Sequence, residues 1–282
     1  MKIYGTSLLA LGLFSPKDAW GFQAALPKML KLSSSSAALQ AVGWDNMESL
    51  SPFLRVEGES RKTWKFPDID KKVVQVVMKT EGRPVQAVSE LWVGPDYIPV
   101  KLKCYSEDGL VRPIQTVLAT RNKVANVEIR NTAGYMMPLS GSAAYAEAPL
   151  LTVREDVAAK SKGRRVEGGA VHTVALDGKV GQVQVMLNTE GKQLSARVEL
   201  LTGPNNIKQF FEIFTNNGSL NSLYVVFNTP GTGSVVRIVN TNTIEFPLTS
   251  YIEPYSMKAD LKKAEQFDVG GGYFTMDKNG QW

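Results

Sequence analysis

The sequence predicts a mainly β protein: two tandem homologous antiparallel β-sandwich-like modules with internal pseudo-two-fold symmetry, followed by a C-terminal tail. Three observations predict this fold class: an internal repeat, a period-two alternation of apolar and polar residues, and turn signals about every ten residues. The 282 residues leave room for two modules that each bury a core.

The repeat is the most specific of the three observations. Residues 75–139 match the chain at a constant offset of 109, without a gap, and 20 of these 65 positions are identical. Chance at ordinary composition gives roughly four identities. The matched blocks are Thr-Glu-Gly at 80–82 and 189–191, Gly-Pro at 94–95 and 203–204, and, upstream, Arg-Val-Glu-Gly at 55–58 and 165–168. Similar strand composition explains matching apolar residues but not these blocks, so the repeat indicates a duplication.

The alternation predicts strands with one buried face. Ile98, Val100, Leu102 and Cys104 alternate with Lys101 and Lys103, and the second copy alternates in the same way at 194–200. With the turn spacing, this predicts roughly five to seven short strands per module, arranged as a sandwich or jelly-roll-like sheet.

Glycine and proline are expected to shape the turns, because glycine tolerates a positive φ. The turn residues assigned in this way are Gly82, Gly94, Pro95, Gly191, Gly203 and Pro204. Asn131-Thr132 and Asn240-Thr241 are interpreted as turns at strand ends. Gly231-Thr232-Gly233 is also interpreted as a turn, because it lacks the lysine and following helix of a phosphate loop.

Residues 1–45 are predicted to be a targeting leader. A short basic start and the apolar run 3–14 are typical of a signal peptide, too short to span a bilayer stably. Residues 22–42 lack acidic residues and contain serines and lysines, as transit peptides do. The junction at Phe22 resembles the bipartite leader of proteins imported into complex plastids. Plain secretion followed by a flexible segment is the alternative.

The remaining boundaries follow from the repeat. Module 1 is expected at 50–148, a linker at 149–164, module 2 at 165–255 and a tail at 256–282. The tail has helical propensity over 257–267 and then aromatic residues, which are typical interface anchors. The candidate assembly residues are Phe267, Tyr273, Phe274 and Trp282. Docking of the tail on its own modules is the alternative to contact with a neighbouring molecule.

Composition excludes several classes of function. The net charge is +5, but residues 1–44 contribute +3 of it, so the body lacks the dense basic stripe of a nucleic-acid-binding protein. The only cysteine is Cys104 and the only histidine is His172, which rules out an intrachain disulfide and a Cys/His zinc cluster. We interpret Cys104 as a small buried hydrophobe and His172 as a polar strand residue. No catalytic residue, cofactor, metal site or membrane span is expected.

With these features together, the chain resembles the pyrenoid-shell proteins of diatoms. The resemblance depends on the paired Thr-Glu-Gly and Gly-Pro blocks, the Arg-Val-Glu-Gly openings and the segment 246–255, and covers about residues 50–282. It implies a structural protein that self-assembles into a sheet-like shell around the Rubisco-containing pyrenoid of the plastid and limits CO2 leakage. The implied partners are further copies of the chain, with the Rubisco matrix or related shell proteins as other candidates.

Two other classes of function remain open at this point. Paired β-sandwiches also occur as binding modules for a protein or glycan partner, which a ligand at matching loops of both modules would support. An enzyme would need a polar cleft with perturbed titratable groups, for example His172 buried beside a carboxylate.

Overall fold

Alternating side chains give the strands one face in a shared core. In β5 (Tyr97–Ser106), Val100, Leu102 and Cys104 are buried, while Lys101 and Lys103 between them are exposed. The same alternation in β15 (Ser234–Asn240) buries Val236 and Ile238. The mainly β fold class is therefore confirmed.

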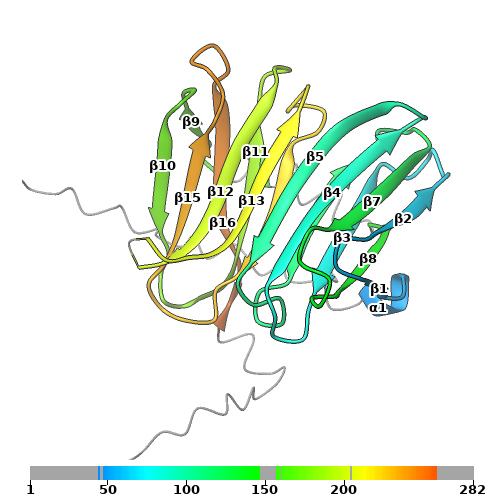
Figure 1. The fold of residues 1–282 in the computed structure, drawn as a ribbon. Coiled ribbons are helices and arrows are strands. Elements are labelled where there is room, and N and C mark those ends of the chain that lie inside the picture. Colours follow the sequence, from blue (N-terminus) through cyan, green and yellow to red (C-terminus); the bar gives the residue numbers. More distant parts are fainter. Residues whose placement is uncertain (1–43, 45–46, 147–156, 160, 204, 259–282) are drawn as a thin grey trace, which may run out of the picture.

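The computed structural model describes residues 44, 47–146, 157–159, 161–203 and 205–258 (Figure 1). Besides α1 (Met47–Leu50), the remaining elements are β1 (Leu54–Val56), β2 (Arg61–Phe66), β3 (Val73–Lys79), β4 (Val85–Val93), β6 (Ile114–Ala119), β7 (Ala125–Asn131), β8 (Leu139–Tyr145), β9 (Arg164–Val166), β10 (Val171–Ala175), β11 (Val180–Asn188), β12 (Leu194–Thr202), β13 (Ile207–Thr215), β14 (Leu223–Asn228) and β16 (Leu248–Met257). Each copy of the repeat contributes eight strands, more than the five to seven expected. The two shortest, β1 and β9, have three residues each, too few for a period-two pattern to show.

The strands form two antiparallel sheets of eight that face each other as a sandwich (Figure 1). Sheet A has the order β1-β8-β3-β6-β14-β11-β16-β9, and sheet B the order β10-β15-β12-β13-β5-β4-β7-β2. Each sheet takes four strands from each copy. One half of sheet A has the order β1-β8-β3-β6. The other half, read from the opposite edge, has the equivalent order β9-β16-β11-β14, as the duplication predicts.

The two copies meet where equivalent strands pair with each other, and we call this boundary the seam. In sheet B, β5 pairs with β13 and Lys103 lies opposite Glu212; in sheet A, β6 pairs with β14 and Thr116 lies opposite Val225. Both pairs of residues are separated by the repeat offset of 109. Antiparallel pairing about equivalent residues is the register that a two-fold relation between the copies requires. The pseudo-two-fold symmetry itself stays a prediction.

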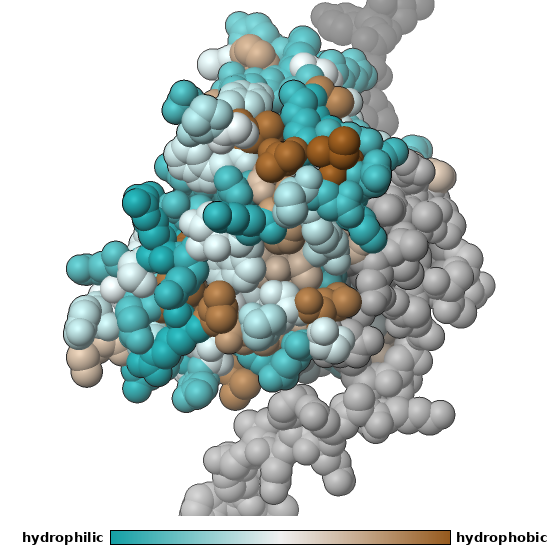
Figure 2. Space-filling model, turned by 90° about the vertical axis from the view of Figure 1, so that its right-hand side faces the viewer, coloured by the Kyte–Doolittle hydropathy of each residue, from teal (hydrophilic) through white to brown (hydrophobic). Residues whose placement is uncertain are grey.

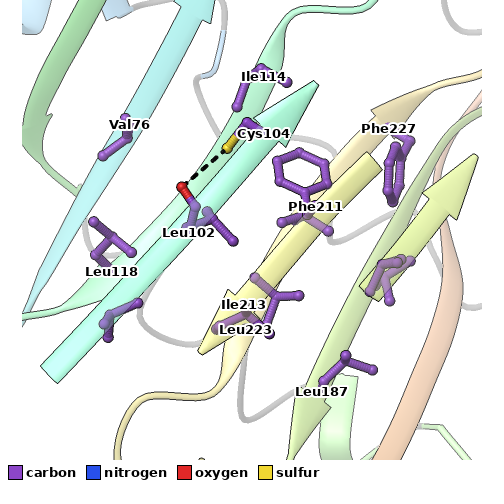
Figure 3. Packing of buried hydrophobic residues seen from close by; sticks show 14 of the residues in the cluster. Val76, Leu102, Cys104, Ile114, Leu118, Leu187, Phe211, Ile213, Leu223 and Phe227 are labelled. Atoms are coloured by element: carbon purple, nitrogen blue, oxygen red, sulfur yellow. Dashed lines mark hydrogen bonds between the residues drawn. The ribbon is translucent and has the colours of Figure 1, made fainter. Parts of the chain in front are cut away.

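The space between the sheets is filled by one apolar cluster that crosses this seam (Figure 3). Phe211 on β13 and Phe227 on β14 pack edge to face, with ring centroids 5.2 Å apart. Leu102 and Cys104 lie beside them on β5, and the Cys104 thiol is directed at the carbonyl oxygen of Leu102, 3.8 Å away. The two copies thus share a core as well as their sheets.

Cys104 is expected to be chemically inert in the folded protein. Its side chain is buried and burial alone raises the pKa of the thiol above its ordinary value, so little thiolate forms. We expect labelling by a disulfide reagent at about pH 8 to be at least about a hundredfold slower in the native protein than in denaturant. A cysteine introduced at the exposed Val124 is the control and should react at once. Equally fast labelling of the native wild-type chain would contradict the burial.

Sheet A is buried on its outer face as well. Trp44, Met47 of α1 and Val157 pack there in a second apolar cluster with residues of the central strands, such as Val77 and Tyr224. Tyr224 is fully buried and donates a hydrogen bond to the Gln184 side chain at 2.9 Å. Residues that precede and follow the first copy in the sequence therefore cover this face, whereas none of the described segments packs over the outer face of sheet B.

Candidate functional site

Within the described residues, both sheets end in edge strands at the two ends of the sandwich. Sheet A ends in the three-residue strands β1 and β9, and sheet B ends in β2 and β10. Strand β2 contains Arg61, Lys62 and Lys65, all exposed, whereas β10 carries no Lys or Arg and exposes Val171. Exposed cations on an edge strand oppose unplanned pairing, so β10 is the less protected edge of sheet B.

His172 lies on β10, as predicted, and its ring faces the other sheet. Its Nδ1 is 3.1 Å from the hydroxyl oxygen of Ser250 on β16, and that hydroxyl donates to the Arg164 carbonyl oxygen at 3.1 Å. Because the hydroxyl hydrogen is already used, His172 Nδ1 is the donor and the neutral ring carries its proton there. Partial burial, and secondarily the charge of Arg164, lower the pKa of His172. Among the described residues, the hydrogen-bond partner of the ring is Ser250 and no ion pair joins the ring to a carboxylate, so the catalytic arrangement considered above is not formed there.

We expect this lowered pKa to make folding stability depend on pH. The unfolded chain, with a pKa near 6.5, binds more protons than the folded protein in the window below that value. The contribution of His172 is therefore fully present above pH 6.5 and is lost as the pH falls towards the lowered pKa. The free energy of unfolding should drop as the pH falls from about 6.5 to about 5.5, and His172→Gln should reduce that drop. An imidazole NMR titration with a midpoint above 6.5 would contradict this prediction.

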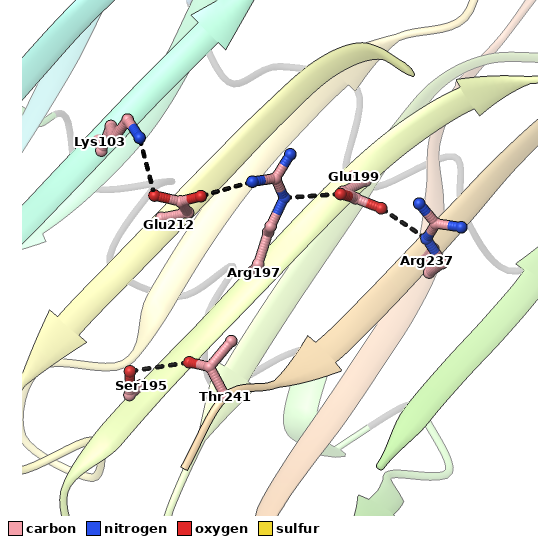
Figure 4. A network of polar contacts seen from close by, with 7 residues as sticks. All are labelled: Lys103, Ser195, Arg197, Glu199, Glu212, Arg237 and Thr241. Atoms are coloured by element: carbon pink, nitrogen blue, oxygen red, sulfur yellow. Dashed lines mark hydrogen bonds and ion pairs between the residues drawn. The ribbon is translucent and has the colours of Figure 1, made fainter. Parts of the chain in front are cut away.

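The outer face of sheet B carries a chain of ion pairs across the seam (Figure 4). Lys103 contacts Glu212 at 3.2 Å, Glu212 contacts Arg197 at 2.6 Å, and Glu199 is held between Arg197 at 2.6 Å and Arg237 at 2.5 Å. The Arg197 guanidinium lies over the ring of Phe210 at 4.0 Å, which adds a cation–π contact. Only 5% of the Glu199 side chain is exposed, so this carboxylate needs both partners. Each charged side chain of this network thus has at least one partner of opposite charge.

Lys103 and Glu212 lie at equivalent positions of the repeat and face each other on the seam. In a dimer of two identical modules, the residue at this position would meet its own copy, and two like charges would repel. Fusing the modules into one chain allows opposite charges at the same place. The seam is therefore better matched than a dimer of either module alone.

The predicted turn glycines have the backbone conformation that their role needs. The φ angles of Gly82, Gly94, Gly191 and Gly203 lie between +70° and +77°. Pro95 lies in the turn between β4 and β5. Pro204 and the four aromatic tail residues Phe267, Tyr273, Phe274 and Trp282 lie outside the described residues.

Sequence reasoning missed the part that Asn131 and Asn240 play. The Asn131 amide donates to the carbonyl oxygens of Val56 and Met137, at 3.1 and 2.8 Å, and its Oδ1 accepts from the backbone N–H of Ala133. Asn240 repeats this pattern, with 3.1 Å to Val166 and 2.9 Å to Phe246. Each asparagine thus joins the edge strand of sheet A to the turn after β7 or β15. The identical Asn-Thr pairs at the repeat offset were the available signal, and they were interpreted only as turns.

Groupings of reactive side chains are few in the part of the chain that the structure describes. Within these residues no group of three or more His, Cys, Asp or Glu side chains is arranged to hold a metal ion. No helix among them is long and apolar enough to cross a bilayer.

A comparison with protein-family models shows the family of the chain. A family model described as diatom pyrenoid shell protein matches residues 44–254. The chain belongs to this family. The resemblance predicted from the paired blocks is confirmed. The match to the pyrenoid shell family begins at Trp44, which packs on the outer face of sheet A, and ends within β16. The unit that defines the shell family therefore includes both copies of the repeat.

Other comparisons add little to the shell family. No curated protein matches the chain. A solved structure of the insecticidal delta-endotoxin Cry8Ea1 from Bacillus thuringiensis is 7% identical, with a TM-score of 0.12. It covers 74% of this chain and 55% of the toxin, so the chain spans about half the toxin's length. A similarity this low carries no argument about fold or function.

Proposed function

We propose that this member of the diatom pyrenoid shell family is a non-enzymatic protein that self-assembles into a sheet-like coat around the Rubisco-containing pyrenoid of the plastid. In this position the coat would maintain the compartment's shape and limit CO2 leakage, supporting carbon fixation. Residues 1–45 are the proposed plastid-targeting leader. The observation that carries the proposal is the family match over residues 44–254.

The geometry of the sandwich supports assembly in an open array. Both sheets continue through both copies and, in the part of the chain that the structure describes, end in edge strands on opposite sides of the molecule, β1 and β2 at one end and β9 and β10 at the other. Contacts between different ends of successive copies generate extended arrays when the rotation between the copies does not close a ring. On the face of the molecule shown in Figure 2, apolar side chains of the described residues lie in small patches among polar ones. Such a surface can stay in contact with water in an assembled coat.

The test is direct assembly of the purified protein. A chain beginning at Trp44, the first residue of the family match, should form sheets or tubes in negative-stain electron microscopy. A protein that stays monomeric at high concentration, with and without Rubisco, would rule out the shell and favour a binding module. A fluorescent fusion of the full chain should form a rim around the pyrenoid, and diffuse stromal fluorescence would contradict the proposed location.

We also propose that the aromatic tail residues Phe267, Tyr273, Phe274 and Trp282 take part in assembly. Because β16 continues to Met257 and the Lys258 amine is hydrogen-bonded to the carbonyl oxygens of Gly178 and Gly231, the deletion that tests the tail should begin at residue 259. A shortened chain that forms unchanged sheets would remove the tail from the mechanism.

A further inference from the structure

One turn of the first copy exposes three large apolar side chains in a row. Tyr135, Met136 and Met137, between β7 and β8, are 75%, 77% and 41% exposed. Single exposed hydrophobic residues are common on soluble proteins, but consecutive ones on a projecting turn are typical of contact sites. We call residues 132–138 tip 1.

Tip 1 is held rigidly by the body of the molecule. Asn131 binds the Met137 carbonyl oxygen at 2.8 Å, and the Arg83 guanidinium donates to the Met136 carbonyl oxygen at 2.9 Å. The Met137 N–H donates to the Gly134 carbonyl oxygen at 2.9 Å, which closes the turn. The side chains are therefore presented in one arrangement, and little conformational entropy is lost when they are covered.

The second copy presents an equivalent turn, residues 241–247, which we call tip 2. Asn240 binds the Phe246 carbonyl oxygen at 2.9 Å, and the Lys192 amine donates to the Glu245 carbonyl oxygen at 3.0 Å. Ile244, the equivalent of Tyr135, is 71% exposed. The scaffold is retained while the exposed residues differ: Glu245 stands where tip 1 has Met136.

A surface groove lies beside each tip. The groove at tip 1 is lined by Arg55, Glu57, Glu81 and Arg83 together with Tyr135 and Met136. The smaller groove at tip 2 is lined by the equivalent residues Arg165, Glu190 and Lys192. Because equivalent strands are antiparallel at the seam, the two tips lie at opposite ends of the strands and in opposite halves of the sandwich. One copy could therefore use both tips at once, each with a different neighbour.

We propose that tip 1 and its groove on one copy receive tip 2 of a second copy of this chain, so that successive copies join into a row. The apolar side chains of Tyr135 and Met136 would cover Ile244. The Glu245 carboxylate would approach the Arg83 guanidinium beside Met136, because Arg55 is already paired with Glu57 at 2.7 Å. Contact between two copies of tip 2 would instead bring Glu245 near its own equivalent. Hydrogen bonds, first from the Thr243 side chain, lower the pKa of Glu245 and keep this carboxylate charged. The inference depends on the proposed self-assembly.

The first test removes the apolar surface of tip 1 from a chain that begins at Trp44. The double variant Tyr135→Ser, Met136→Ser should raise the protein concentration needed for assembly by at least about tenfold, since exposed anchors of this kind dominate interface energies. Its thermal unfolding should remain that of the wild type, because both side chains face the solvent. The matched controls Ile69→Ser and Val124→Ser, at the other ends of the adjoining strands and 53% and 55% exposed, should assemble normally. A double variant that assembles like the wild type would overturn the proposal.

The second test identifies the partner surface. Met136→Cys and Ile244→Cys chains, mixed and treated with a short bismaleimide, should give crosslinked dimers, while Cys104 stays unreactive in the core. Replacing either chain with Val124→Cys should abolish the product. If crosslinks between two Met136→Cys chains or two Ile244→Cys chains predominate, the pairing of tip 1 with tip 2 is wrong. A wild-type protein that never assembles would refute both proposals, whereas normal assembly without the mixed crosslink would refute only this one.

Discussion

Phe211→Ala should reduce the free energy of unfolding by about 3–5 kcal/mol, the range found when a buried phenylalanine is truncated. Phe211 is fully buried, packs edge to face on Phe227, and lies opposite Cys104 across the seam. The substitution leaves a cavity where both copies of the repeat and both sheets meet. Equilibrium unfolding in denaturant, followed by far-ultraviolet circular dichroism, measures the loss.

The same strand provides the control. Phe214 lies three residues further along β13, on the outer face, and is 44% exposed. Phe214→Ala should cost less than about 1 kcal/mol, because little apolar surface is lost from the interior. The shared core also predicts one cooperative transition for both copies. Two separate transitions, of which Phe211→Ala moves only one, would contradict a common core.

Gly168→Ala should destabilise the protein by about 3 kcal/mol, at the upper end of the cost of overpacking. A Cβ atom at residue 168 would overlap the carbonyl oxygen of Thr243, which belongs to backbone and cannot rotate away. Gly58 has the same relation to the carbonyl oxygen of Gly134, so Gly58→Ala should have a similar effect in the first copy. Denaturant unfolding of both variants measures the change.

Gly231→Ala is the matched control for these substitutions. An added Cβ at this position meets no atom within 4 Å, and the residue has no positive φ. Its stability should stay within about 0.5 kcal/mol of the wild type or rise slightly, because alanine lowers the entropy of the unfolded chain. If Gly168→Ala were as harmless as Gly231→Ala, the close approach of the turn between β9 and β10 to tip 2 would be refuted.

Features that depend on local sequence were predictable. The alternation around Leu102 and Cys104 gave the buried face of β5, and the Thr-Glu-Gly blocks gave turns that need a glycine with positive φ at 82 and 191. These signals work because strand faces and tight turns are decided by neighbouring residues.

The seam was not predictable in the same way. The sequence shows that β5 and β13 each have one apolar face. The backbone N–H and C=O groups at a strand edge are the same in every strand, so they do not specify which strand pairs there. The pairing of Leu102 with Ile213 is determined by how two distant segments fit together over a common core. The two sandwich-like modules predicted from the repeat therefore share both sheets.

The cover on sheet A could have been noticed in part. The runs at 73–78 and 223–227 are apolar on both faces, which is typical of strands buried on two sides. Trp44 was assigned to the leader and excluded from the fold, so nothing remained in the prediction to cover that face. The structure shows Trp44 packed there with Val157, and the family match begins at the same residue.

The continuity of both sheets across the seam has a mechanical consequence for a coat made of such units. A chain with two separately folded halves could flex at its linker and follow a curved surface by bending within each unit. Here the strand pairs β5–β13 and β6–β14 join the two halves in both sheets, so we expect the molecule to be stiff. A coat built from stiff molecules takes its curvature from the angles at the contacts between them. Substitutions at these contacts should therefore change the diameter of tubes while each molecule keeps its shape.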